Sequence, residues 1–204
     1  MNADRLQEGL RTKQFGKRIV FLREVDSTND YAKELASYGA EEGTAVVGET
    51  QTAGRGRLGR EWISPKGGLY FSVILRPRIS ASEAVKLVFV AGLAVAKIFE
   101  EVYGLHVEIK KPNDVLVNGK KISGILAETN TTGEKVNYTI IGIGINVNFD
   151  VKETLPKELA KNATSLENEL DKKIRLEQLF KALIEKLESL YLLFLKGQLA
   201  NSCF

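Results

Sequence analysis

Residues 115–149 read VLVNGKKISGILAETNTTGEKVNYTIIGIGINVNF, and this stretch decides the fold. Asn118-Gly119 lies between two apolar runs and is the dipeptide most typical of a two-residue β-hairpin turn. Strands are expected on both sides of it, at residues 115–117 and 121–129, and a long strand follows at 136–149. Strands that follow one another in hairpins indicate an antiparallel or mixed sheet.

The sequence before this stretch adds further strands and a first helix. Strands are expected at residues 18–22, 44–49, 69–75 and 106–110. Ser27-Thr-Asn-Asp30 resembles a capping box, which predicts a helix that begins there, runs to about Ser37 and stops at Gly39.

Two longer helices are expected beside the sheet. Ser80-Ala-Ser-Glu83 is a second capping box, which opens a long buried helix ending near Gly104. Apolar residues recur at helical spacing from Leu176 to Phe194, before Gly197. The fold class is therefore α+β, a mixed or antiparallel sheet with helices packed on one face.

Composition excludes several classes of protein. The 204 residues include 29 basic and 26 acidic ones, and a net charge of +3 is too small for a general nucleic-acid coat. A single cysteine, Cys203, rules out an intramolecular disulfide and a cysteine-based zinc site, which fits a reducing cytoplasm. Neither a secretory signal nor an apolar run of membrane-spanning length is visible. We therefore expect a cytoplasmic protein without a membrane partner.

A loop rich in glycine and arginine lies at residues 54–60, with the sequence GRGRLGR. Glycine lets the backbone approach a ligand closely, and arginine supplies planar donors for phosphate or carboxylate. The loop therefore resembles a cationic clamp, although a basic loop can also bind RNA without specificity. Trp62 follows the loop, where it could stack on a base or pack in the core.

Bare backbone marks one face of the long strand. Ile141, Ile143 and Ile145 share the core face, whereas Gly142 and Gly144 leave the other face without side chains. Glycine is unusual inside a strand, so either a ligand or a tightly packed helix is expected there. Gly124 is a similar position in a neighbouring strand, and Lys110, at a strand end before Pro112, could reach into a cleft.

The sequence lacks the residues of several common catalytic and nucleotide-binding sites. His106 is the single histidine, so a histidine-based catalytic triad and a multi-histidine metal site are excluded. The chain has no Walker-type phosphate loop and no Gly-x-Gly-x-x-Gly at the start of a helix. The candidate site is thus suited to positioning and charge stabilisation.

Six ordered motifs resemble those of biotin protein ligases. They are Asp26-Ser-Thr-Asn29, Gln51-Thr-Ala-Gly-Arg-Gly-Arg-Leu-Gly-Arg60, Gly67-Gly-Leu69, Lys110-Lys-Pro-Asn-Asp114, Lys121-Ile-Ser-Gly-Ile-Leu-Ala-Glu128 and Gly142-Ile-Gly-Ile-Asn-Val-Asn148. The resemblance extends from about Val20 to Asn148, and it implies a fold related to the catalytic domains of class II aminoacyl-tRNA synthetases. One departure is Lys111, which stands where the family usually has an aromatic residue.

The resemblance also implies a role for each matching residue. The residues implied to bind biotin are Ser27, Thr28, Asn29, Gln51, Gly54, Arg55, Gly56, Arg57, Lys110, Gly124, Ile125 and Leu126. Those implied to bind the nucleotide are Arg57, Arg60, Trp62, Lys110, Asn113 and Asn146. Lys110 and Arg57 would be the catalytic pair, and no metal ligands are identified.

The implied reaction has two steps and several partners. Biotin and MgATP would form biotinyl-5′-AMP, and biotin would then pass to a lysine of a biotin carboxyl carrier protein. No DNA partner is expected, and a homodimer is kept as one option. Residues 1–17 are expected to form an N-terminal extension and residues 18–204 the catalytic domain, without the small C-terminal β-barrel usual in the family.

Three alternatives remain open from the sequence. A lipoate or octanoyl transferase shares the fold, but the Gly-Arg-rich loop and the Lys-Lys-Pro-Asn-Asp motif argue against it. A biotin-binding relative that has lost transfer would bind biotin without labelling a carrier domain. The third alternative, an RNA-binding protein, is supported by the basic loop alone and predicts salt-sensitive binding of RNA.

Overall fold

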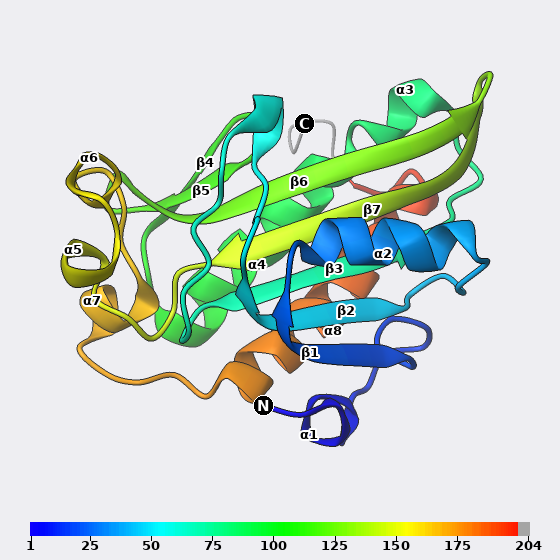
Figure 1. Ribbon diagram of the computed structural model, residues 1–204. Coiled ribbons are helices and arrows are strands. Elements are labelled where there is room, and N and C mark those ends of the chain that lie inside the picture. Colours follow the sequence, from blue (N-terminus) through cyan, green and yellow to red (C-terminus); the bar gives the residue numbers. More distant parts are fainter. Residues whose placement is uncertain (200–204) are drawn as a thin grey trace.

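The computed structural model describes residues 1–199, so the predictions for Cys203 and the last residues lie outside it. Within that range the chain forms one sheet of seven strands in the order β1-β2-β3-β7-β6-β5-β4 (Figure 1). The strands are β1 (Ile19–Val25), β2 (Ala45–Gln51), β3 (Leu69–Leu75), β4 (Val107–Lys110), β5 (Asp114–Val117), β6 (Lys120–Thr132) and β7 (Lys135–Ile145). The helices are α1 (Ala3–Gln7), α2 (Thr28–Ser37), the 3₁₀ turn η1 (Arg57–Gly59), α3 (Ala81–Ala84), α4 (Leu87–Tyr103), α5 (Val151–Thr154), α6 (Lys157–Ala160), α7 (Leu166–Leu170) and α8 (Leu176–Leu195).

The sheet is mixed, as predicted. β1 and β2 run parallel and are joined by α2, whereas the other neighbouring strands pair antiparallel. The turn between β5 and β6 is the predicted Asn118-Gly119 hairpin, and both residues have the positive φ that a type I′ turn requires, 51° and 74°.

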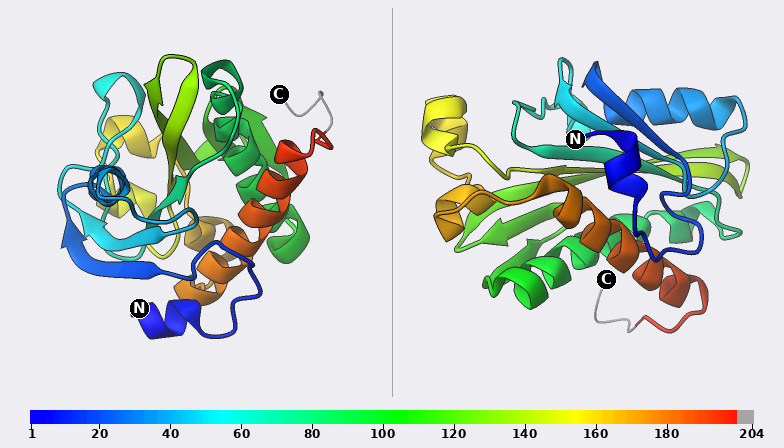
Figure 2. Two further views of the ribbon diagram at one scale, coloured as in Figure 1. Left: turned by 90° about the vertical axis from the view of Figure 1, so that its right-hand side faces the viewer. Right: turned by 90° about the horizontal axis from the view of Figure 1, so that it is seen from below.

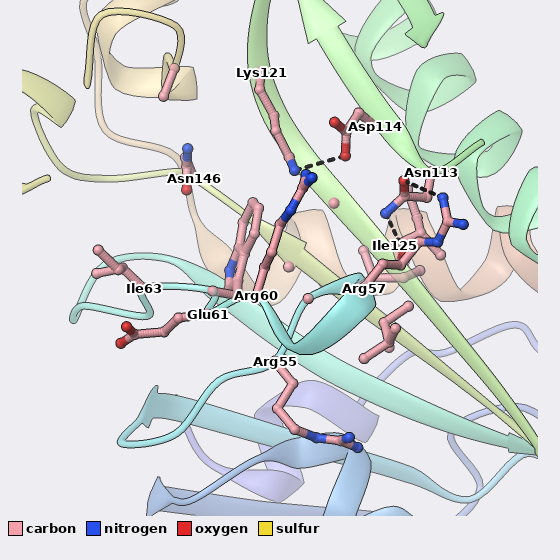
Figure 3. A pocket seen from close by; sticks show the side chains of 18 of the residues that line it. Arg55, Arg57, Arg60, Glu61, Ile63, Asn113, Asp114, Lys121, Ile125 and Asn146 are labelled. Atoms are coloured by element: carbon pink, nitrogen blue, oxygen red, sulfur yellow. Dashed lines mark hydrogen bonds and ion pairs between the residues drawn. The ribbon is translucent and has the colours of Figure 1, made fainter. Parts of the chain in front are cut away.

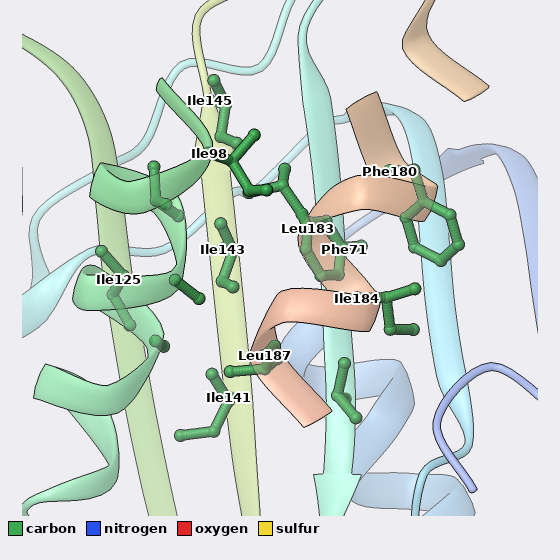
Figure 4. Close-up of a cluster of buried hydrophobic side chains, with 14 of the residues drawn as sticks. Phe71, Ile98, Ile125, Ile141, Ile143, Ile145, Phe180, Leu183, Ile184 and Leu187 are labelled. Atoms are coloured by element: carbon green, nitrogen blue, oxygen red, sulfur yellow. The ribbon is translucent and has the colours of Figure 1, made fainter. Parts of the chain in front are cut away.

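The main core lies between the sheet and the two long helices, α4 and α8. Alternate residues of β3 and β7, such as Phe71, Ile141 and Ile143, pack against them (Figure 4). Phe71 meets Phe180 of α8 edge-on at 5.2 Å between ring centroids. Each such fully buried side chain stabilises the fold by about 1.5–3 kcal/mol.

The opposite face of the sheet carries α2, which Figure 1 shows in front of the strands. Ala32 and Ala36 of α2 pack there on Val46, Ile74 and Ile140 in a smaller apolar cluster. The predicted fold class is confirmed, with one addition. The two long helices share one face, and the short α2 covers part of the other.

The predicted helix after Ser80 is divided into α3 and α4. The capping box of Ser80 and Glu83 forms as expected. Between the two helices the backbone tightens into a turn with an i→i+3 bond from the Lys86 N–H to the Glu83 carbonyl, 2.9 Å. α4 then ends at Tyr103, close to the predicted end, and its C-cap Gly104 has a left-handed φ of 66°.

Residues 1–17 pack against the rest of the domain through a few buried side chains. Leu6 and Phe15 are fully buried among core residues. The Glu188 carboxylate of α8 accepts three successive backbone N–H groups, from Lys13, Gln14 and Phe15, at 2.6–2.8 Å. The N-terminal segment is thereby held against α8, as Figure 2 shows.

This contact generates a stability prediction. In Glu188→Gln an amide N–H₂ replaces one acceptor oxygen and faces backbone donors, so we expect the free energy of unfolding to fall by about 2 kcal/mol. Urea unfolding monitored by circular dichroism measures the change. The control is Glu101→Gln, which removes an exposed ion pair to Lys186 of the same helix. Equal unfolding midpoints for the two variants would contradict the role given to Glu188.

Candidate functional site

A cavity of about 720 Å³ lies on the face of the sheet that the long helices leave uncovered. Its wall is built by the start of α2, the loop between β2 and β3, the β4–β5 turn, parts of β6 and β7, and the segment around α6. The structure brings together here nearly all of the predicted site residues. They are Ser27, Thr28, Asn29, Gln51, Arg55, Gly56, Arg57, Arg60, Trp62, Lys110, Asn113, Gly124, Ile125, Leu126 and Asn146.

Gly54 is the predicted site residue that does not line the cavity. Its carbonyl accepts the Trp62 N–H at 2.8 Å. A side chain at this position would collide with the Trp62 carbonyl oxygen. Gly54 therefore allows the two ends of the loop to approach each other closely.

The start of α2 is fixed by a chain of hydrogen bonds. Ser27 caps the helix by accepting the Asp30 N–H, which is half of the expected capping box. Both the N–H and the hydroxyl of Thr28 donate to Gln51 Oε1, at 2.8 and 3.1 Å. Gln51 in turn donates to Ser64 at 2.7 Å. Buried polar side chains are thus paired with one another at this end of the cavity.

Asn29 and Arg55 both donate hydrogen bonds to the carboxylate of Glu128, which does not line the cavity. Glu128 of β6 accepts a hydrogen bond from Asn29 Nδ2 at 2.8 Å and another from Arg55 at 2.6 Å. Lys33 of α2 donates to its second oxygen at 2.5 Å. Burial tends to raise the pKa of Glu128, but the hydrogen bonds from Lys33, Asn29 and Arg55 outweigh it and leave that pKa below its ordinary value.

The loop arginines point in three directions (Figure 3). Arg55 turns toward α2, where it also pairs with Asp30 at 2.7 Å. Arg57 reaches Asn113 across the cavity at 3.4 Å, and Arg60 points toward Lys121. Leu58, at the tip between them, is 87% exposed and has a φ of 57°. The loop therefore has an anchored base and a tip directed at the cavity.

The bare strip on β6 and β7 is covered by protein side chains. Gly124 and Gly144 are register partners, and Cβ atoms built on them would lie 2.9 and 2.5 Å from the Trp62 indole. A Cβ on Gly142 would collide with the Asn29 amide. These glycines therefore let Trp62 and Asn29 lie on the sheet at the floor of the cavity. The indole Nε1 is buried there without a hydrogen-bond partner among residues 1–199.

Three lysines line the cavity, Lys110, Lys111 and Lys121, and sequence analysis predicted Lys110 alone as a site residue. The Lys110 side chain is exposed at the end of β4 and forms no hydrogen bond or ion pair within the described part of the chain. The Lys121 ammonium lies 2.7 Å from Asp114 Oδ1 and 5.2 Å above the Trp62 ring. Its position at the start of β6, three residues before the bare Gly124, was the available signal. Lys111 lies over the Phe89 ring at 5.7 Å.

The far wall was also missed by sequence analysis. Leu155 and Leu159, in and beside the short helices α5 and α6, line the cavity. Asn146 is buried and donates to the Thr164 carbonyl at 2.9 Å. The Lys121 backbone bonds to the same segment through Asn162 and Thr164. Helices of four residues leave too little periodicity for detection from the sequence.

His106 is exposed and does not line the cavity. Within residues 1–199 no three histidine, cysteine, aspartate or glutamate side chains gather in a way that could hold a metal ion. No helix in that range has both the length and the apolar character needed to cross a membrane.

The close fit of Trp62 on Gly144 is testable, because Trp62 is the only tryptophan in the sequence. In Gly144→Ala the added methyl group overlaps the indole, so we expect a red-shifted tryptophan emission and greater quenching by acrylamide. Gly92→Ala is the matched control, since a Cβ there would make ordinary contacts at 3.8 and 3.9 Å. Identical emission spectra for the two variants would contradict the packing described here.

The fold resembles those of solved biotin protein ligases. The enzyme from Aquifex aeolicus in complex with biotin and ATP matches with a TM-score of 0.75 and 36% identity, over 88% of this chain and 72% of that one. The enzyme from Leishmania major in complex with biotinyl-5-AMP matches with a TM-score of 0.70 and 30% identity, over 91% and 83%.

The sequence comparisons place the chain in a family. The model of the biotin/lipoate A/B protein ligase family matches residues 21–146, and the chain belongs to this family. The bifunctional ligase/repressor BirA of Bacillus subtilis is 42% identical over 175 residues, which is 85% of this chain and 54% of that protein. The biotin–[acetyl-CoA-carboxylase] ligase of Paracoccus denitrificans is 42% identical over 128 residues, 62% of this chain and 53% of that protein. The chain thus spans about half the length of these curated relatives.

Proposed function

We propose that this chain carries the active site of an ATP-dependent biotin protein ligase. The observation that carries the proposal is the convergence of the arginine loop, three lysines and the glycine-bearing face of β6 and β7 on one cavity. The relatives and structural neighbours named as biotin ligases support it. Its acceptor is a lysine of a biotin carboxyl carrier protein, and its location is the cytoplasm.

The first step joins biotin to the nucleotide. A carboxylate oxygen of biotin attacks the α-phosphorus of ATP, bound as its magnesium complex, and pyrophosphate leaves with the electrons of the broken P–O bond. Arg57 and Arg60 bring positive charge to the growing negative charge on the phosphate. The cavity also holds both substrates in line, which lowers the entropic barrier of their reaction.

The second step transfers biotin to the acceptor. The neutral amine of the acceptor lysine attacks the carbonyl carbon of the mixed anhydride, AMP leaves, and the amine loses a proton as the amide forms. The loop tip, residues 56–60, lies over the cavity and limits the access of water to the anhydride.

The substrates divide the cavity between them. Biotin occupies the end beside Ser27, Thr28, Asn29 and Gln51, and its tail follows Gly124, Ile125 and Leu126. The nucleotide lies toward Trp62, Asn113 and Asn146. This division places the reacting carboxylate and phosphate near Arg57 and the cavity lysines.

Lys121 is better placed than Lys110 for the phosphate. Its ammonium is held by Asp114 and lies over Trp62, so it is positioned before substrate arrives. Lys110 is exposed and must be ordered on binding, which costs side-chain entropy. The sequence analysis assigned a catalytic role to Lys110. We now assign charge stabilisation of the phosphate to both lysines, with the larger contribution from Lys121.

Pyrophosphate release in the presence of biotin and MgATP distinguishes the two lysines. We expect Lys121→Met to lower the rate by about 100-fold or more, and Lys110→Met by less than about tenfold. Lys120→Met is the control, because Lys120 is exposed on the same strand and does not line the cavity. The reverse order of effects would return the main role to Lys110.

Acceptor labelling tests the proposed function itself. The protein is incubated with biotin, MgATP and a carrier domain, and the mass of the carrier is measured. We expect a mass increase equal to one biotinyl group, and none when lipoate replaces biotin. Pyrophosphate release without labelling would reduce the function to adenylation, and labelling with lipoate alone would point to the lipoate branch of the family.

A further inference from the structure

Glu128 lies just outside the cavity, and its three hydrogen-bond donors come from two segments, helix α2 and the arginine loop. Its side chain is not part of the cavity wall. It accepts from Asn29 and Lys33 on α2 and from Arg55 in the loop. We propose that Glu128 is a positioning residue, which acts on the ligand through Asn29 and Arg55; this inference rests on the proposed function.

The partners of Glu128 require a carboxylate. All three atoms that face it, Asn29 Nδ2, Lys33 Nζ and Arg55 Nη2, are donors, and two of them are cations. A carboxylate offers acceptors on both oxygens, whereas an amide offers one acceptor and a donor. Glutamine could therefore fill the same space but would set an N–H₂ group against another donor.

Glu128 decides which part of Asn29 faces the ligand. Asn29 Nδ2 donates to Glu128 and, at 3.4 Å, to the Leu126 carbonyl, so both of its hydrogens have partners. Asn29 Oδ1 lies 2.6 Å from the Ser72 hydroxyl, which donates to it. The amide is thereby locked, and what it can still offer to the cavity is the second lone pair of Oδ1. Asn29 is thus prepared to accept a hydrogen bond from a ligand N–H.

Glu128 also anchors the base of the arginine loop, whereas the tip of the loop is not held by it. Arg55 is held between Glu128 and Asp30, at 2.6 and 2.7 Å, from β6 and α2 respectively. Arg57 and Arg60 remain directed at the cavity, and Gly56 closes the turn by donating to the Arg60 carbonyl at 2.6 Å. The base therefore stays on the sheet while the tip is free to adjust to the ligand.

The ionised state of Glu128 persists at neutral pH. Burial disfavours its charge, but the hydrogen bonds from Lys33, Asn29 and Arg55 dominate and lower its pKa. Asp30 adds a second carboxylate to the same group, where it pairs with Lys33 and Arg55. The two cations and two carboxylates therefore balance in charge.

The test is Glu128→Gln, compared with Glu101→Gln as a control. Glu101 pairs with one lysine on the far side of the molecule and does not line the cavity. In biotin-dependent pyrophosphate release we expect the KM for biotin to rise about tenfold or more in Glu128→Gln, while kcat changes less than about threefold. The control should match the unsubstituted protein.

Combining Glu128→Gln with a substitution of Asn29 shows whether Glu128 acts through Asn29. In Asn29→Ala the partner amide is gone, so adding Glu128→Gln should change the KM for biotin less than it does alone. Full additivity of the two changes, or an unchanged KM in a folded Glu128→Gln variant, would overturn the proposal. Thermal unfolding of each variant shows whether it is folded.

Amide hydrogen exchange gives a readout that does not depend on the enzymatic reaction. Exchange of residues 52–61 should become faster in Glu128→Gln than in Glu101→Gln, because the base of the loop loses its anchor. Equal exchange in the two variants would overturn the proposal. If the unsubstituted protein released no pyrophosphate, the proposed function would fail, while the exchange result would still decide the role of Glu128.

Discussion

The absence of side chains at three positions of the sheet is the constraint on which the site depends. Gly124, Gly142 and Gly144 lie on the face that α4 and α8 do not cover. Any side chain at Gly142 or Gly144 would displace Asn29 or Trp62 from the floor of the cavity. The same strands bury isoleucines on their other face, so one segment supplies both the core and the floor of the site (Figure 4).

Electrostatics then divide the wall of the cavity into a fixed part and an adaptable part. Arg55 and Lys121 are neutralised by Asp30, Glu128 and Asp114, which holds them in place before a ligand binds. Arg57 and Arg60 have no carboxylate partner within residues 1–199. An anionic ligand can therefore recruit the charges at the loop tip, while the anchored groups keep the geometry of the floor.

Strong local signals made much of this structure predictable from sequence. The Asn118-Gly119 turn, the Ser80 capping box and the alternation along β7 each depend on a few adjacent residues, and each is found in the structure. Five of the six motifs contribute residues to one cavity, and the Gly67-Gly-Leu69 motif does not line it; the separate roles of these residues are predictions.

What sequence analysis missed depends on contacts between distant segments. Lys121 is positioned by Asp114, Trp62 and the backbone of residues 162–164, none of which its own neighbours reveal. Residues 1–17 contain little apolar periodicity, and their place in the core comes from the Glu188 carboxylate of a helix at the other end of the chain. The short α5 and α6 gave no helical pattern, yet they close the far wall.

A crystal structure of this protein grown with biotin and ATP tests the central claim most directly. We predict one continuous acyl-adenylate in the cavity above Trp62 and Asn29, with its phosphate within hydrogen-bond distance of Arg57 and Lys121. A ligand bound elsewhere, or a phosphate out of reach of both side chains, would contradict the account.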